Sequence, residues 1–151
     1  MNHLRINHLA VFVCVILLHV LGFFWYGPIF GERWMAMVGL DMSSAESGAG
    51  EAGLWITNFI ACLAPVYVLA WLFTKLNVTS GVRGAGIAFR ISFTFHHLSV
   101  MSGNMFAAQP YELAWITGGF SLVAMALSGF ILGAWTKVNS EVKSARTTTT
   151  V

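Results

Sequence analysis

Residues 54–73 read LWITNFIACLAPVYVLAWLF, and this stretch contains no Asp, Glu, Lys, Arg or His. A helix needs about 20 mostly apolar residues to cross the hydrocarbon core of a bilayer, and this stretch has that length. Residues 113–135 form a second stretch of the same kind. Residues 9–26 and 84–106 are similarly long and apolar, although they contain a few polar residues. The sequence therefore predicts four transmembrane helices.

The composition agrees with this interpretation. Charged residues make up 9% of the 151 residues, whereas soluble domains have about 25%. Hydrophobic residues make up 57%, and lipid tails accept the apolar surface that a soluble fold would leave in water. We predict an all-α fold, an integral membrane four-helix bundle over residues 1–136 with a polar cytoplasmic tail over 137–151. The net charge of +2 is too small to indicate nucleic-acid binding, so the expected partner is the lipid bilayer.

The basic residues predict the orientation of this bundle. If the chain crosses four times, one side has only Arg33 together with the acidic residues Glu32, Asp41, Glu46, Glu51 and Glu112. The other side holds the remaining basic residues outside the helices, which are Arg5, Lys75, Arg83, Lys137, Lys143 and Arg146. Because cytoplasmic loops carry an excess of Lys and Arg, we predict that both ends of the chain are cytoplasmic.

A stripe of polar residues follows one face of the helix predicted over residues 84–106. Its members recur every three or four residues, so they share a face at about 100° per residue; they are Arg90, Thr94, His97, Met101 and Asn104. A polar stripe facing lipid is costly, so we expect it to face the bundle interior. Ser92, His96, Ser99 and Gly103 form a second stripe, whose small residues predict close packing against another helix.

Helices one and two add polar residues at similar depth. His19 and Tyr26 share a face of helix one, and His19 and His97 are predicted to meet in the outer leaflet. The candidate polar pocket therefore consists of His19, Tyr26, Asn58, Arg90, Thr94, His97 and Asn104.

Three interpretations of this cluster remain open. The first is hydrogen bonding between helices, the second is a small polar binding pocket or proton path, and the third is a metal or haem site with paired imidazole ligands. We expect the first, and therefore no cofactor and no metal. Arg90 has a simpler explanation, because its long side chain can reach the cytoplasmic headgroups.

The sequence contains no pattern typical of an enzyme. No Asp or Glu lies within a predicted span, and no phosphate-binding loop, nucleophile elbow or HExxH motif is present. Cys14 and Cys62 lie inside apolar stretches and form no CxxC motif. We predict no catalytic residues and a non-enzymatic structural or interaction component. The alternatives are a small-molecule or ion carrier acting as an oligomer and a haem or metal redox protein.

The fourth predicted helix contains a GxxxG motif at Gly129 and Gly133. Such motifs allow two helix backbones to approach closely. The motif predicts tight packing either within the chain or between copies, which would make a homo-oligomer.

The outer end of helix one reads Gly22-Phe-Phe-Trp25-Tyr26-Gly27-Pro28-Ile-Phe30-Gly31-Glu-Arg-Trp34. Trp25 and Tyr26 are expected to anchor the helix end at the headgroups. Pro28 between two glycines allows a sharp turn, after which Phe30 and Trp34 hold the next segment on the surface. We predict a membrane-exit corner made of Gly22, Trp25, Tyr26, Pro28, Phe30 and Trp34 within the outer loop 27–53. Residues 41–53 are expected to be a hydrated loop, in which Ser43 and Glu46 could cap a helical turn.

This stretch resembles the signature of a family of small bacterial membrane proteins known as domain of unknown function 1761. Looser matches are Asn104-x-Phe106, Gln109-Pro110 and Gly129-Phe-Ile-Leu-Gly133-Ala-Trp135. The resemblance extends from helix one to Trp135. It implies a four-helix fold and a multi-pass location in the bacterial inner membrane, and it implies no activity.

Overall fold

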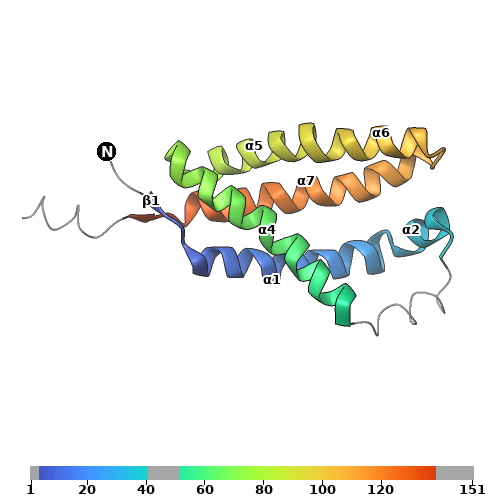
Figure 1. Cartoon of the computed structure of the whole chain (residues 1–151), viewed down its shortest axis with the longest axis horizontal. Coiled ribbons are helices and arrows are strands. Elements are labelled where there is room, and N and C mark those ends of the chain that lie inside the picture. The colour runs from blue at the N-terminus through green and yellow to red at the C-terminus, as the bar shows by residue number, and fades with distance from the viewer. Residues whose placement is uncertain (1–3, 41–51, 139–151) are drawn as a thin grey trace, which may run out of the picture.

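The computed structural model describes residues 4–40 and 52–138, and most of these residues are helical (Figure 1). The first helical segment consists of α1 (His8–Phe24), the π-helical turn η1 (Trp25–Ile29) and α2 (Gly31–Val38). The Asn7 side chain starts α1 by accepting a hydrogen bond from the backbone N–H of Ala10 (3.4 Å). The chain bends at Gly27, whose backbone is not helical.

Three further helical segments follow, and two strands flank the helical part. The segments are α4 (Ala52–Leu76), the continuous run of α5 (Gly81–Ile91), η2 (Ser92–His97) and α6 (Leu98–Phe106), and α7 (Tyr111–Ala134). The strands are β1 (Leu4–Arg5) and β2 (Lys137–Val138). The predicted loop over 41–53, with its Ser43 cap, lies almost entirely outside the described residues, as does most of the predicted tail.

Three segments in the described part of the chain are long and apolar enough to cross a membrane, namely His8–Ile29, Ala52–Leu76 and Tyr111–Ala134. The span predicted over 84–106 corresponds to α5, η2 and α6 and is not among these three. Large apolar side chains cover the outside of the molecule, including Phe23, Phe95 and Phe106, each more than 70% exposed. A soluble monomer rarely exposes so much apolar surface. The chain is therefore all-α with three candidate membrane spans.

The continuous segment of α5, η2 and α6 lies antiparallel beside α7, and α4 crosses obliquely over the others (Figure 1). Glycines allow α5 and α7 to touch. A Cβ atom on Gly129 would lie 2.5 Å from the carbonyl oxygen of Gly84, and a Cβ on Gly133 would lie 2.5 Å from that of Ser80. The glycines of both helices therefore face each other within one chain.

The hydrophobic core occupies one half of the molecule, the half that contains both strands. Four of its buried residues come from α1, four from the second half of α4 and two from the second half of α7, and the others are Val78 after α4 and Ala88 of α5. The residues of the three helices are Ala10, Val11, Cys14, Leu18, Val66, Leu69, Ala70, Phe73, Ala124 and Leu132. In the other half, residues 52–61 of α4 are all exposed. Helix α4 thus packs against the core at one end of the molecule and separates from α1 and α7 toward the other end.

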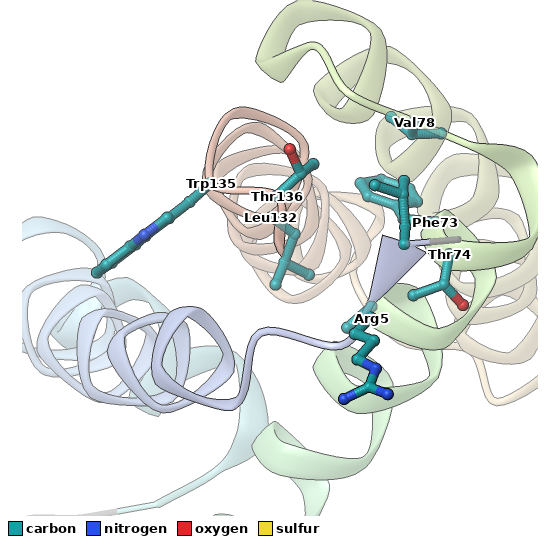
Figure 2. A pocket seen from close by; sticks show the side chains of 9 residues that line it. Arg5, Phe73, Thr74, Val78, Leu132, Trp135 and Thr136 are labelled. Carbon is teal, nitrogen blue, oxygen red and sulfur yellow. The ribbon is translucent and has the colours of Figure 1, made fainter. Parts of the chain in front are cut away.

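The tightly packed end brings both ends of the helical part together. Strand β1 pairs antiparallel with β2, so that Arg5 lies opposite Lys137. The Asn7 side chain donates a hydrogen bond to the carbonyl of Trp135 (3.1 Å). A cavity of about 20 Å³ lies at this end, lined by β1, by the end of α4 and by the residues around the end of α7. Figure 2 shows the side chains that line it. Its volume is sufficient for about one water molecule.

The opposite end contains an ion pair between α2 and α7. The guanidinium Nη1 of Arg33 lies 3.0 Å from Oε1 of Glu112, and both side chains are exposed. Arg33 is the basic residue that the sequence assigned to the outer side, and here it pairs with a carboxylate.

The turn η2 changes which residues of the third segment face inward. A π-helical turn contains extra chain compared with an α-helical turn, so residues beyond it are rotated relative to a wheel drawn at 100° per residue. His97 is buried, whereas Arg90 and Thr94 are exposed. The prediction of one inward polar stripe is therefore wrong. The second predicted stripe also fails, because a Cβ atom on Gly103 would meet no described residue within 4 Å and His96 and Ser99 are exposed.

Candidate functional site

The separated half of the molecule contains a cavity of about 380 Å³ between α1, α4 and α7. We call it the His19 cavity. Its polar lining comes from His19 and Tyr26 of the first segment and Asn58 of α4, and its remaining walls are Leu18, Gly22, Phe23, Trp55, Cys62 and Phe120. It exists because α4 diverges from α1 and α7 over residues 52–61.

A second cavity of about 270 Å³ lies next to it, and we call it the Ser92 cavity. Ser92 and His96 of η2 and Ser121 of α7 are its polar lining, with Leu18, Ala61, Cys62, Pro65, Ile91, Phe95, Phe120, Ala124 and Met125 as apolar walls. Leu18, Cys62 and Phe120 line both cavities and form the wall between them. Because Pro65, Phe95 and His96 are exposed, the Ser92 cavity opens on the flank between α4 and η2.

Neither cavity is lined by Asp, Glu, Lys or Arg from the described part of the chain. A charged molecule leaving water for such a site would meet no permanently charged side chain among these residues, and its desolvation would be costly. The two cavities are therefore suited to uncharged molecules.

The structure divides the predicted polar pocket. His19, Tyr26 and Asn58 come together at the His19 cavity. Three other members do not line either cavity: Arg90 and Thr94 are exposed and Asn104 is half-buried. The Thr94 hydroxyl donates to the carbonyl of Arg90 (2.7 Å) on its own helix.

His19 and His97 lie in different surroundings. The His19 Nδ1 is 2.8 Å from the carbonyl oxygen of Val15, and its ring packs against Phe59 of α4. His97 is fully buried between Phe93 and Trp115, with its Nδ1 side directly against Gly118 of α7. The two imidazoles do not form a common ligand pair, so the geometry gives no support to the paired-imidazole interpretation. In the described part of the chain, no three His, Cys, Asp or Glu side chains group as metal ligands.

Two buried polar side chains lack a hydrogen-bond partner among the described residues. They are Ser92, through its hydroxyl oxygen, and His97, through both ring nitrogens. Buried polar groups without partners are uncommon in folded proteins. Ser92 also lines a cavity, which makes it the more informative of the two. The sequence predicted that Ser92 packs against another helix. The structure instead places Ser92 at the start of η2, in the lining of a cavity.

A known family shares the sequence pattern of this chain. The pattern of a family described as a protein of unknown function, DUF1761, matches residues 9–133. The chain belongs to the DUF1761 family. No curated protein and no solved structure matches it.

The most specific stretch of the DUF1761 chain, residues 22–34, forms an aromatic contact between the end of α1 and α7. The indole N–H of Trp25 donates to the carbonyl of Ile116 (3.0 Å). Tyr26 packs against Phe120 and against Trp34, with ring centroids 5.4 Å apart in each pair. Trp25 was expected to anchor the helix end at the headgroups, but its polar atom bonds to the protein itself. The corner is therefore also an attachment to α7.

The other members of the predicted corner define how the chain bends. Pro28 lies within η1 and is exposed, Phe30 packs against Trp25 at 4.9 Å between ring centroids, and Gly22 faces the ring of Phe120. A Cβ on Gly31 would lie 2.7 Å from the carbonyl oxygen of Tyr26. Close approach of the backbone thus requires glycine at the start of α2.

The GxxxG motif of the DUF1761 chain is buried within the chain. Gly129 and Gly133 both face α5, at Gly84 and Ser80. Of the two possibilities that the sequence left open, the geometry supports packing within the chain. This pair of glycines is therefore not available to bind a second copy in the way a homo-oligomer through this motif requires.

Proposed function

We propose that this DUF1761 protein crosses the bacterial inner membrane four times, with both ends in the cytoplasm, and acts without catalysis by binding a small molecule within the bilayer. The observation that carries the binding role is the pair of cavities separated by Leu18, Cys62 and Phe120. Their volumes, about 380 and about 270 Å³, are close to or within the range of about 300–1,000 Å³ of small-molecule sites.

The four-crossing topology is supported by the third segment and by the ends of the molecule. The continuous run from Gly81 to Phe106 accompanies α7, and at a rise of about 1.5 Å per residue it is long enough to span the hydrocarbon core. The paired strands bring the basic residues Arg5 and Lys137 to one end, while Arg33 at the other end is paired with Glu112. The excess of basic residues at the first end fits the rule that cytoplasmic segments are rich in Lys and Arg.

The bilayer is the partner that this surface requires. The outward side chains are apolar around α1, α4 and α7, and lipid tails are the surroundings in which such a surface is stable. A ligand would reach the Ser92 cavity from the lipid side, through the flank between α4 and η2.

Photolabelling of the full chain in lipid vesicles tests the binding role. The probe is a medium-chain alcohol that carries a diazirine, and the adducts are mapped by mass spectrometry. We expect saturable adducts near Cys62 and Phe120. Ala61→Trp would fill the Ser92 cavity and abolish saturable labelling there, whereas Ala64→Trp, an exposed neighbour on α4 that lines neither cavity, would leave it unchanged. Labelling that never saturates and spreads over all lipid-facing segments would overturn the proposal.

A further inference from the structure

The hydroxyl of Ser92 differs from four other hydroxyls of the helices. Serine and threonine in a helix commonly donate to a carbonyl of the preceding turn, and these four do so. Thr74 bonds to the carbonyl of Trp71 and Thr94 to that of Arg90, both at 2.7 Å. Ser99 bonds to the carbonyl of Phe95 and Ser128 to that of Ala124, at 2.8 and 2.9 Å. Ser92 makes no such bond, and its hydroxyl oxygen is buried without a partner among the described residues.

Ser92 lies where the backbone departs from regular α-helix. Ser92 is the first residue of η2, and its backbone N–H is directed at the carbonyls of both Ala88 and Phe89. Thr94, inside the same π-helical turn, still donates to the carbonyl of Arg90, so the missing bond is particular to Ser92. Such turns often occur at functional sites. Ser92 thus has an uncommitted hydrogen-bonding group, and the residue is 4% exposed in the lining of a cavity.

The rest of the lining defines what this group would meet. The Ser92 cavity is mostly apolar, and the described residues that line it include no charged side chain, with His96 and Ser121 as its other polar groups. The apolar part of a ligand fits these apolar walls. An uncharged polar group of the same ligand can form a hydrogen bond with the serine hydroxyl. A hydrocarbon alone would leave Ser92 unpaired, at a cost in free energy.

We infer that the ligand is a neutral, mainly apolar molecule whose hydroxyl or carbonyl group hydrogen-bonds to Ser92. Its apolar part lies between α4, η2 and α7. The inference rests on the proposed binding function and specifies the class of ligand. Molecules with a permanent positive charge fall outside this class, because the described residues of the lining include no Asp or Glu.

Two matched probes and two matched variants test it. The probes are the diazirine alcohol described above and the diazirine alkane of the same chain length, compared at equal concentrations in the bilayer. We expect the alcohol to label the cavity of the wild-type chain with higher affinity than the alkane. Ser92→Ala should weaken the binding of the alcohol by about 2- to 10-fold, the effect of one hydrogen bond, and leave the binding of the alkane unchanged. Ser99→Ala, whose hydroxyl is bonded to its own helix, should change neither.

A second measurement separates binding from a structural role. Without probe, Ser92→Ala should melt at the same temperature as the wild-type chain or higher, because the change removes an unpaired polar group. Equal labelling by the alcohol in Ser92→Ala and wild type would overturn the inference, and so would equal affinity for the two probes. If Ala61→Trp still abolishes labelling in those cases, the proposed binding function survives. If no probe labels the cavity saturably, the proposed function itself fails.

Discussion

Gly118 of α7 lies directly beneath the imidazole ring of His97, and a methyl group at Gly118 would overlap the Nδ1 atom of that ring. The ring also packs against Trp115, with 4.7 Å between centroids, and against Phe93, with 5.5 Å. A fully buried side chain thus fills a space that exists only because the facing helix has glycine there.

The first prediction follows from this contact. Gly118→Ala should displace His97 and destabilise the chain by about 1–3 kcal/mol, the usual cost of overpacking a close-packed site. The melting temperature of the purified full chain in detergent would report the loss. Gly119→Ala is the matched control, because its Cβ would meet only Trp25 at an ordinary 3.5 Å. Equal effects of the two substitutions would contradict the contact.

A second prediction concerns the α5–α7 contact. Gly129→Ala would bring its methyl group to 2.5 Å from the carbonyl oxygen of Gly84 and 2.6 Å from the Cβ of Ala88. Backbone cannot yield locally, so the two helices should separate, and the yield of folded protein in membranes should fall. Gly86→Ala should be neutral or stabilising by up to about 1 kcal/mol, because only Arg90 approaches it, at 3.8 Å. Normal accumulation of Gly129→Ala would show that these helices are not in close contact.

The third prediction concerns Trp25. Trp25→Phe removes the hydrogen bond to the carbonyl of Ile116 but keeps an aromatic ring, so it should cost about 0.5–1.5 kcal/mol. Trp25→Asp should cost more, since it places a charge against Phe30 and Phe120. Pro28→Ala should be milder than Trp25→Asp, because Pro28 is exposed. Thermal unfolding of the three variants gives the order, and a Trp25→Asp chain as stable as Pro28→Ala would refute it.

A fourth prediction decides the number of crossings. Reporters fused at Ala45, Thr79, Gln109 and Ser144 should place Thr79 and Ser144 in the cytoplasm and the other two positions outside. Thr79 and Gln109 flank the segment from Gly81 to Phe106, so opposite signals there mean that this segment crosses the membrane. The same signal at both would leave three crossings and put Ser144 outside.

The fifth prediction concerns the histidines. Since His19 packs against Phe59 and His97 against Trp115, the purified chain should show no haem Soret absorption, and replacement of either histidine by Gln should preserve the fold. His97→Leu should be neutral or stabilising, because the ring nitrogens have no partner among the described residues. A Soret band, or stoichiometric metal lost on His97→Gln, would establish ligand binding by these residues.

The sequence was sufficient for the helical fold and for the family, because long apolar stretches and the Gly22–Trp34 signature are local properties of the chain. It also indicated the close packing at Gly129 and Gly133. It could not show that this packing lies within the chain, since a glycine motif carries no information about which helix it meets.

The polar stripe failed for a specific reason. The wheel that grouped Arg90, Thr94 and His97 assumes regular α-helix, and η2 interrupts that regularity between Ser92 and His97. The two cavities could not be predicted from the sequence either. They depend on the oblique crossing of α4 and on Phe120, a residue that looks like any other apolar member of α7. Three of the residues grouped by depth, His19, Tyr26 and Asn58, nevertheless line one cavity, because depth along each helix is set by residue number alone.

The pairing of β1 with β2 has a consequence for biogenesis. Leu4 lies opposite Val138, so the two partners are separated by nearly the whole described chain. A ribosome delivers Leu4 first and Val138 only after every helix has been synthesised. The leading end of the first helix therefore stays unattached until translation has passed the last helix. The pairing of β1 with β2 is therefore a late event in assembly. It can form only after all the helices have been synthesised.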